Sequence, residues 1–307
     1  MMKKRIIALV LTVVLILPLC ACGKKPLKVM FIAFDYSNHE YTQVSDGLKA
    51  AIGDGNVDLT VELIQTPVDP SDEENFLAGW KECVERHKDE KFDVIVSPSI
   101  PFWYEAGGDP EIPVVLFSNS ASVEEAKKFI AEKNDAKYLL NVFQEYNAPT
   151  IIDRALGEYL GATCTKDDNI GIIPIFMESF DKTALEQGKP GVAPAKYFSQ
   201  DSGDVGESLK DFFGKNEINI LCTNEPVLLF AQMYKNEYGA EKVIYFGAYG
   251  DAETNGLMNG TYDAIVGNSY YDTGYALGRE LVSISSGKAP KDVYVLPTVL
   301  TRDLLLK

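Results

Sequence analysis

Residues 28–34 read KVMFIAF, a run that is apolar at every position after the first and therefore on both faces of an extended strand. Strands of this kind are typical of a parallel sheet that helices cover on both sides. Seven more strand-length runs rich in Val and Ile follow, several also apolar on both faces, at 57–64, 93–97, 113–118, 170–176, 218–223, 242–248 and 264–269.

The segments between these runs carry signals for the start of a helix. A Ser or Asp followed three residues later by Glu, the pattern of a capping box, begins at Ser71, Ser122 and Asp204. We therefore expect helices over 71–87 and 122–133 and a third before Phe213. This alternation predicts an α/β fold of doubly wound layers, with ligands bound outside the carboxyl ends of the strands.

The N-terminus has the layout of a secretion signal. A basic cluster at 3–5 precedes sixteen largely apolar residues, 6–21, a run shorter than the roughly 20 residues of a membrane-spanning helix. The run ends in LCAC (19–22), which resembles the lipobox of bacterial lipoproteins, and this implies that Cys22 becomes N-terminal and carries diacylglycerol and palmitate. We expect a signal peptide over 1–21 and a lipid tether over 22–26. The alternative is an ordinary signal peptide with incidental cysteines.

Composition and charge exclude some partners. With 46% apolar and 24% charged residues, the 307-residue chain is ordinary for a globular protein of about two domains. Its net charge is −16, and removal of residues 1–21 with their three positive charges leaves 286 residues at −19. Because such a surface repels phosphate backbones, we expect no nucleic-acid partner and assign membrane contact to lipid.

Few residues are available for metal or redox chemistry. After Cys22 the cysteines are Cys83, Cys164 and Cys222, widely spaced and set among apolar residues or at element ends. This spacing indicates buried free thiols rather than a disulfide framework or a CxxC metal site. The two histidines, His39 and His87, are little material for a catalytic triad or a zinc site, so we expect neither metal nor cofactor.

Motifs for catalysis are also missing from the sequence. GxSxG, HExxH and Walker A patterns do not occur. Residues 251–256 begin like a calcium loop, but Tyr262 stands where its bidentate carboxylate belongs. We therefore expect no enzyme. A hydrolase on an α/β scaffold stays open as an alternative, because only the lack of a recognisable nucleophile and base argues against it.

Six segments, taken in order, resemble a known family. They are KVMFIAFDYSNHEYTQVSDGLKAA (28–51), FDVIVSP (92–98), IPVVLFSN (112–119), ILCTNEP (220–226), KVIYFGAYGDAETNGLMNG (242–260) and AIVGNSYYDTGYALGRELVSISSGKAP (264–290). Their order and spacing resemble the ribose-binding-protein-like, type I solute-binding proteins of bacterial ABC transporters over essentially all of the mature chain.

The resemblance implies two Rossmann-like lobes, each of three layers with a parallel sheet, joined by three crossing strands. We expect residues 27–142 plus about 269–296 to form the N-terminal lobe. Residues 143–268 plus 297–307 would form the C-terminal lobe. The two lobes would close around a small ligand, with hinges at the crossings.

Aromatic, Asn and Ser side chains at the predicted strand ends are the candidates for ligand binding. They are Tyr36, Asn38, Tyr41, Ser97, Trp103, Ser118, Asn119, Asn224, Tyr249 and Asn268, with Glu178 a weaker one. By resemblance, Asn38 matches an Asn that binds sugar hydroxyls and Tyr41 an aromatic that stacks on the ring. Asn224 matches an Asn or Asp at the same strand end, and Asn268 a Gln or Asn near the second hinge. Each candidate has a plain alternative as a core, surface or turn residue.

Two departures from the family bear on the ligand. Ser118-Asn119 stands where sugar binders commonly have Asp-Arg, and Gly247-Ala248-Tyr249 where they have Gly-Phe-Asp. Hydrogen bonds to charged groups are stronger than neutral ones, so their loss weakens the case for a pentose or hexose. A planar ligand such as a nucleoside would use the tyrosines better, so we expect it to outcompete free ribose or glucose and Tyr41→Ala to cost more affinity than Ser118→Ala.

The sequence thus predicts a lipid-anchored receptor, monomeric and outside the cytoplasm, that captures a small polar solute and delivers it to an ABC permease in the membrane. The alternative is a binding module that passes its ligand state to a chemoreceptor or a sensor kinase. Both functions would use the same fold and crevice.

Overall fold

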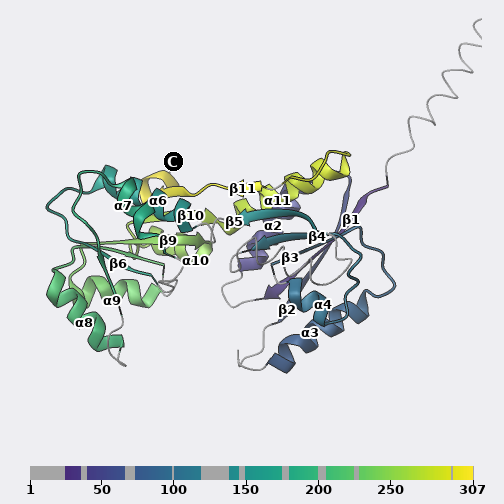
Figure 1. Ribbon diagram of the computed structural model, residues 1–307, viewed down its shortest axis with the longest axis horizontal. Helices are drawn as coiled ribbons and strands as arrows, with labels where there is room; N and C mark the ends of the chain where they lie inside the picture. The colour runs from purple at the N-terminus through teal and green to yellow at the C-terminus, as the bar shows by residue number, and fades with distance from the viewer. Residues whose placement is uncertain are drawn as a thin grey trace, which may run out of the picture.

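The computed structural model describes residues 25–35, 40–65, 73–98, 100–118, 138–144, 149–174, 180–199, 205–224, 228–291 and 293–306. They form two lobes side by side, each built on one six-stranded sheet (Figure 1). The expected signal peptide, residues 22–24 of the tether and the 122–133 helix lie outside these residues. Among the residues that the structure describes, no helix combines the length and apolar character needed to cross a bilayer.

The first lobe contains the sheet with strand order β11-β5-β4-β3-β1-β2. Its strands are β1 (Leu27–Asp35), β2 (Val57–Gln65), β3 (Val94–Ser97), β4 (Val114–Ser118), β5 (Tyr138–Gln144) and β11 (Val293–Val295), all parallel to their neighbours. Helices α2 (Glu40–Ile52) and α11 (Tyr270–Ser285) lie over one face, and α3 (Glu73–Arg86) and α4 (Ile100–Glu105) over the other (Figure 1). Residues 29–34 of β1 are all buried, as a strand with two apolar faces requires.

The second lobe contains the sheet with strand order β12-β10-β9-β8-β6-β7. Its strands are β6 (Ile170–Ile173), β7 (Lys196–Tyr197), β8 (Ile220–Thr223), β9 (Lys242–Tyr249), β10 (Ala264–Ser269) and β12 (Thr298–Thr301). Its helices are α6 (Pro149–Thr163), α7 (Lys182–Gly188), α8 (Val205–Asn216), α9 (Leu228–Tyr238), α10 (Asp251–Met258) and α12 (Arg302–Leu305). Residues 251–258, whose sequence begins like a calcium loop, form the helix α10 instead of a loop.

Alternation along β9 separates two cores in this lobe. Ile244 and Phe246 pack with the α6 side chains Leu156 and Leu160 on one face of the sheet. The intervening Tyr245 packs with Phe213 of α8 on the other face. Because successive side chains of a strand point to opposite faces, both faces of this sheet are covered and the three-layer arrangement follows.

Three connections join the lobes, and each leaves from the carboxyl end of a strand. The chain passes from β5 to α6, from β10 directly into α11, and from β11 to β12 after two residues. Since β5 and β11 end toward the second lobe and β10 ends toward the first, the carboxyl edges of the two sheets face each other. So short a link after β11 has no room for a crossover helix, and β12 pairs antiparallel with β10.

Close helix packing completes the first lobe. A Cβ atom on Gly274 of α11 would stand 1.9 Å from the carbonyl oxygen of Val44 in α2, and one on Gly47 of α2 would stand 2.0 Å from the carbonyl oxygen of Tyr271. Side chains at these positions would hold the two helices apart. The glycines therefore let a late segment of the chain dock against the first helix.

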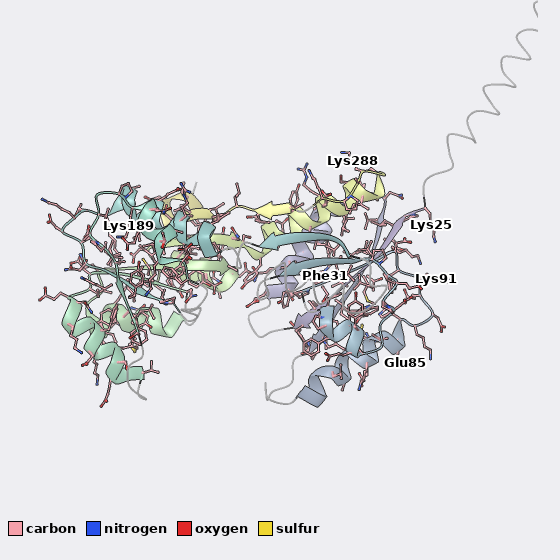
Figure 2. All side chains as sticks on the ribbon, in the orientation of Figure 1. Lys25, Phe31, Glu85, Lys91, Lys189 and Lys288 are labelled. Carbon is pink, nitrogen blue, oxygen red and sulfur yellow. The ribbon has the colours of Figure 1, made fainter. Side chains whose placement is uncertain are left out.

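The side chains follow the usual division between interior and surface (Figure 2). Phe31 lies inside the first lobe, while Lys25, Glu85, Lys91 and Lys288 are exposed on its outside. Lys189 in the second lobe is one of the exceptions, because its side chain is fully buried. Its Nζ pairs with Glu186 at 2.9 Å and donates to the Ala193 carbonyl oxygen at 2.5 Å, so the charge is compensated.

Candidate functional site

Five of the predicted ligand residues stand at the facing edges of the two sheets. Ser97 and Ser118 end β3 and β4 in the first lobe. Asn224 follows β8, Tyr249 ends β9 and Asn268 is the last residue but one of β10 in the second lobe. The structure thus places these positions at the carboxyl edges between the lobes, where ligands bind in open α/β sheets. Tyr36, Asn38, Asn119 and Glu178 lie outside the described residues, as does the side chain of Ser118.

Two predicted aromatic residues lie in the core of the first lobe. Tyr41 is 4% exposed and belongs to the core cluster with Phe34 and Val44. Trp103 is also 4% exposed, and its ring lies so close to Gly108 that a Cβ atom there would come within 2.2 Å of it. Both rings therefore contribute to lobe stability through burial.

Tyr249 is tied to the strand that returns to the second lobe. Its ring is 6% exposed, and its hydroxyl is hydrogen-bonded to Thr298 Oγ1 at 3.0 Å. Burial raises the pKa of the Tyr249 phenol, so it stays neutral. This hydrogen bond fixes the start of β12 beside the end of β9, next to one of the three connections.

Glycines at the end of β9 and β10 allow the backbones to approach closely there. Gly247 has φ of 137°, which favours glycine, and it pairs with Gly267 of β10. A Cβ atom on Gly267 would stand 1.6 Å from the Gly247 carbonyl oxygen. Side chains are thus excluded from this step of the sheet, immediately before Asn268.

Asn268 has an unusual environment. It continues the face of β10 that carries Val266, which packs with the α6 side chains, and it is only 1% exposed. Neither its amide nitrogen nor its amide oxygen has a hydrogen-bond partner within the described part of the chain. Burying an unpaired polar atom costs about 1 to 3 kcal/mol. At the carboxyl edge of the strand, this amide can hydrogen-bond a group that both donates and accepts a hydrogen bond.

A contact between the lobes was not anticipated from the sequence. The Oε1 atom of Gln43, in the first turn of α2, accepts a hydrogen bond of 3.1 Å from the backbone N–H of Asp251 at the start of α10. Buried Glu253 accepts from the backbone N–H of Gly250 at 2.8 Å, and burial, aided by the charge of Glu40 on the first lobe, raises its pKa. The only sequence signal for Gln43 was its place in the helix after the first strand.

A buried carboxyl lies near the start of α6, beside the first connection. Asp153 is 3% exposed, and its Oδ2 accepts a hydrogen bond of 2.7 Å from the backbone N–H of Asp181. Burial raises its pKa to about 7 despite this hydrogen bond, with the charge of Asp181 adding to the effect. The second lobe therefore holds an acid whose ionisation is unfavourable.

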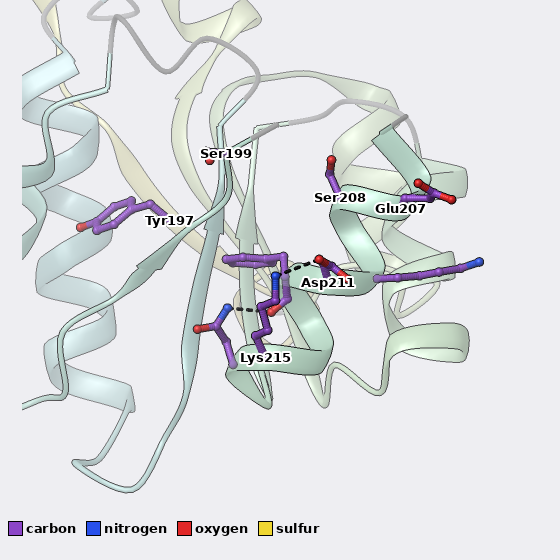
Figure 3. A pocket seen from close by; sticks show the side chains of 9 residues that line it. Tyr197, Ser199, Glu207, Ser208, Asp211 and Lys215 are labelled. Atoms are coloured by element: carbon purple, nitrogen blue, oxygen red, sulfur yellow. Dashed lines mark hydrogen bonds and ion pairs between the residues drawn. The ribbon is translucent and has the colours of Figure 1, made fainter. Parts of the chain in front are cut away.

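Two surface clefts in the described part of the chain contain none of these candidates. One, of about 520 Å³, runs along α8 beside Tyr197 (Figure 3). Lys215 pairs there with Asp211 at 2.8 Å within α8, so these charges satisfy each other. Another, of about 630 Å³, lies along the end of α11 beside Arg279 and Lys288. Among the described residues, Glu62, Cys83 and His87 could together hold a metal ion, and they lie in the first lobe, away from the facing edges.

Comparisons with known proteins agree with this architecture. No family model matches the sequence, and no curated protein does so either. A periplasmic ribose ABC transporter protein from Conexibacter woesei is similar in structure, with a TM-score of 0.62 and 13% identity over 92% of this chain and 95% of that one. An ABC transporter solute-binding protein from Agrobacterium vitis with bound D-fucose has a TM-score of 0.59 and 16% identity over 91% of this chain and 97% of that one.

A glucose-galactose binding protein from Geobacillus stearothermophilus gives a TM-score of 0.56 and 18% identity over 91% of this chain and 99% of that one. The likeness thus extends over both lobes and nearly the full length of each protein. At sequence identities this low, the similarity shows a shared fold and no more. The chain has the two-lobed fold of the ribose-binding-protein-like, type I solute-binding proteins.

Proposed function

We propose that this chain is a lipid-anchored receptor outside the cytoplasm that captures a small polar solute between its lobes and delivers it to an ABC importer. The observation that carries the proposal is Asn268, a buried amide at the facing edge of the second sheet with neither atom paired within the described part of the chain. A ligand with hydroxyl groups can donate to its oxygen and accept from its nitrogen. Binding would then remove an energetic cost that the ligand-free protein carries.

A hydroxylated ligand of sugar size is better supported than a planar one. The case for a nucleoside depended on stacking against Tyr41 and Tyr249, and both rings are buried in the cores of their lobes. The similar structures from Agrobacterium vitis and Geobacillus stearothermophilus are described as binding D-fucose and glucose or galactose. We therefore propose a neutral sugar or polyol as the ligand class.

Closure of the lobes would follow from the three connections. Ser97 and the end of β4 lie on one lobe, whereas Asn224 and Asn268 lie on the other, so neither lobe can surround a ligand alone. We propose residues 27–142 plus 269–296 and residues 143–268 plus 297–307 as the moving units. The Gln43–Asp251 hydrogen bond provides a contact between the lobes beside the crevice. Rotation about the short connections is the hinge motion of such proteins.

Titration calorimetry with a panel of pentoses, hexoses, polyols and nucleosides tests the ligand class directly. We expect at least one sugar or polyol to bind and nucleosides to give no heat. Tight binding of a nucleoside, with all sugars inert, would overturn the ligand class but keep the receptor proposal. No binding to any member of the panel would count against the receptor itself.

The Asn268→Leu variant separates a binding role from a structural one. Leucine removes two unpaired buried polar atoms, so we expect the ligand-free protein to gain about 1 to 3 kcal/mol of unfolding free energy. We expect the ligand found in the panel to bind at least tenfold more weakly, since the amide is lost. Urea unfolding and calorimetry on the same protein measure the two effects.

The matched control is Asn219→Leu, just before β8 in the same sheet. The Asn219 amide is satisfied, because its Oδ1 accepts from the Asn169 N–H at 2.8 Å and its Nδ2 donates to Asp168 at 3.2 Å. This variant should lose stability and keep its ligand affinity. If Asn268→Leu behaves like Asn219→Leu in both measurements, Asn268 has no part in binding.

Lipid anchoring has its own test. In the native host, Cys22→Ala removes the sulfur that diacylglycerol would modify, and we expect the protein to move from the membrane pellet to the soluble fraction. Metabolic labelling with a fatty-acid analogue should mark the unmodified protein and leave the variant unlabelled. Recovery of Cys22→Ala in the pellet would show that something other than Cys22 holds the protein there.

A further inference from the structure

A group of three potential metal ligands lies where β2 meets the end of α3. Glu62 projects from β2, and Cys83 and His87 stand four residues apart at the end of α3 and just after it, so both face the strand. One ligand atom from each residue lies within 4.8 Å of the other two. Cys83 is buried, and the side chains of His87 and Glu62 are only 10% and 19% exposed.

The distances suit a tetrahedral ion after a small adjustment. With metal–ligand distances of about 2.0 to 2.3 Å, the ligand atoms of a tetrahedral zinc site stand roughly 3.3 to 3.7 Å apart. The His87 Nε2 and Glu62 Oε1 atoms are 2.7 Å apart, because a hydrogen bond joins them. Side-chain rotations that open this contact and draw Cys83 Sγ in would make room, and water can supply the fourth ligand at the partly exposed side.

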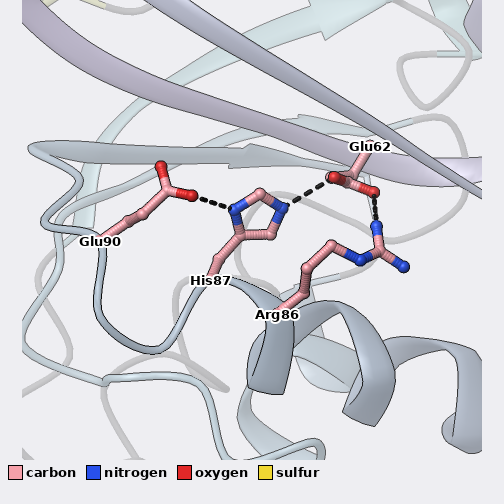
Figure 4. A network of polar contacts seen from close by, with 4 residues as sticks. All are labelled: Glu62, Arg86, His87 and Glu90. Atoms are coloured by element: carbon pink, nitrogen blue, oxygen red, sulfur yellow. Dashed lines mark hydrogen bonds and ion pairs between the residues drawn. The ribbon is translucent and has the colours of Figure 1, made fainter.

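The surrounding charges would orient two of the three ligands (Figure 4). The Nδ1 atom of His87 is hydrogen-bonded to Glu90 Oε1 at 2.7 Å, which would leave Nε2 to bind the ion. A carboxylate on the far nitrogen is the usual support of a zinc-bound histidine. Arg86 Nη1 donates to Glu62 Oε2 at 2.6 Å, so Oε1 stays available.

We propose that Glu62, Cys83 and His87 form a binding site for Zn²⁺ that ties β2 to the end of α3 in the first lobe. The mixed sulfur, nitrogen and oxygen set matches the ligand preferences of zinc. Glu62 stands three residues before the end of β2, about 10 Å from the crevice edge at the rise of a strand. The site is therefore independent of solute binding and acts on the stability of the lobe.

Cobalt spectroscopy and zinc analysis test the site in the purified protein. Cys20 and Cys22 are replaced by alanine in every sample, which leaves Cys83, Cys164 and Cys222 as the only thiols. After equilibrium dialysis at pH 7.5 we expect one zinc per chain, and Co²⁺ should give a thiolate charge-transfer band in the near ultraviolet. Calorimetry in buffers of different ionisation enthalpy should show a buffer-dependent heat, because a thiol must lose its proton when it binds the ion.

Matched variants identify the ligands. Cys83→Ser and His87→Gln should lose the bound zinc, whereas Cys164→Ser should keep both zinc and the cobalt band. Glu90→Gln, which keeps a hydrogen bond to His87 but removes the charge, should bind zinc about 10 to 100-fold more weakly. If Cys83→Ser or His87→Gln fails to fold by circular dichroism, Glu62→Gln takes its place and should also lose the zinc. The proposal is overturned if the wild-type protein takes up no zinc, or if the cobalt band survives in Cys83→Ser.

Discussion

Gly274→Ala should cost about 3 kcal/mol or more of unfolding free energy, at the upper end of what overpacking a core does. The added methyl would stand 1.9 Å from the backbone carbonyl oxygen of Val44, so one helix must move. A flexible side chain could turn aside, whereas a helix carbonyl cannot. Displacing α11 also pulls on β11, the edge strand that follows it. Urea unfolding followed by circular dichroism measures the loss.

The matched control is Gly214→Ala in α8. A Cβ atom at that position meets nothing within 4 Å, so the methyl is harmless and the better helix propensity of alanine should add about 0.5 to 1 kcal/mol. The same chemical change is thus expected to have opposite signs at the two sites. A Gly274→Ala variant as stable as the wild type would mean that α2 and α11 are not in close contact in solution.

Asp153→Asn should stabilise the protein above neutral pH by about 4 kcal/mol, the free energy that corresponds to raising the pKa of this carboxyl from 3.8 to about 7. The ordinary pKa is 3.8 and the folded value about 7, so the folded state binds more protons than the unfolded state between these values. In the wild type, Asp153 therefore makes its full contribution to the unfolding free energy below about pH 4. This contribution is lost as the pH rises to about 7. Asparagine keeps an oxygen to accept from the Asp181 N–H and cannot ionise.

Urea unfolding at several pH values from 4 to 8 tests this prediction. The quantity to follow is the difference in unfolding free energy between Asp153→Asn and the wild type. The difference should grow with pH and level off above 7. Glu158→Gln on the same helix is the control, because its exposed carboxylate pairs with exposed Arg154 and should contribute less than about 1 kcal/mol at any pH. A difference that stays constant with pH would show that Asp153 ionises normally.

Most of the strands in the middle of each sheet could be predicted from the sequence because they are apolar on both faces. All eight predicted runs contain a strand, and the run at 264–269 has the bounds of β10. Four strands were missed, namely β5, β7, β11 and β12. Three of these stand at sheet edges, and β7 and β11 are only two and three residues long. An edge strand has fewer neighbours to pack against, so selection for a continuous apolar run is absent there.

The position of the candidate site could be predicted, but the role of its side chains could not. The alternation of strand and helix patterns in the sequence shows where each strand ends, and this located Asn224, Tyr249 and Asn268 at strand ends. Whether a ring at such a position faces the crevice or the core depends on its neighbours. Tyr41 is covered within the first lobe by residues from other elements. The Gln43–Asp251 contact joins residues 208 positions apart, which no local pattern can indicate.

The interleaving of the lobes determines when the protein can fold as its chain is made. Synthesis runs from the N-terminus, and domains usually fold as soon as they emerge. Here the first sheet lacks its edge strand until residues 293–295 appear, and the second lacks β12 until residue 301. Both lobes therefore reach completion together, once residues 293–301 have been made. Until these residues are made, each sheet exposes an unpaired edge, so the growing chain is then open to proteases and to aggregation.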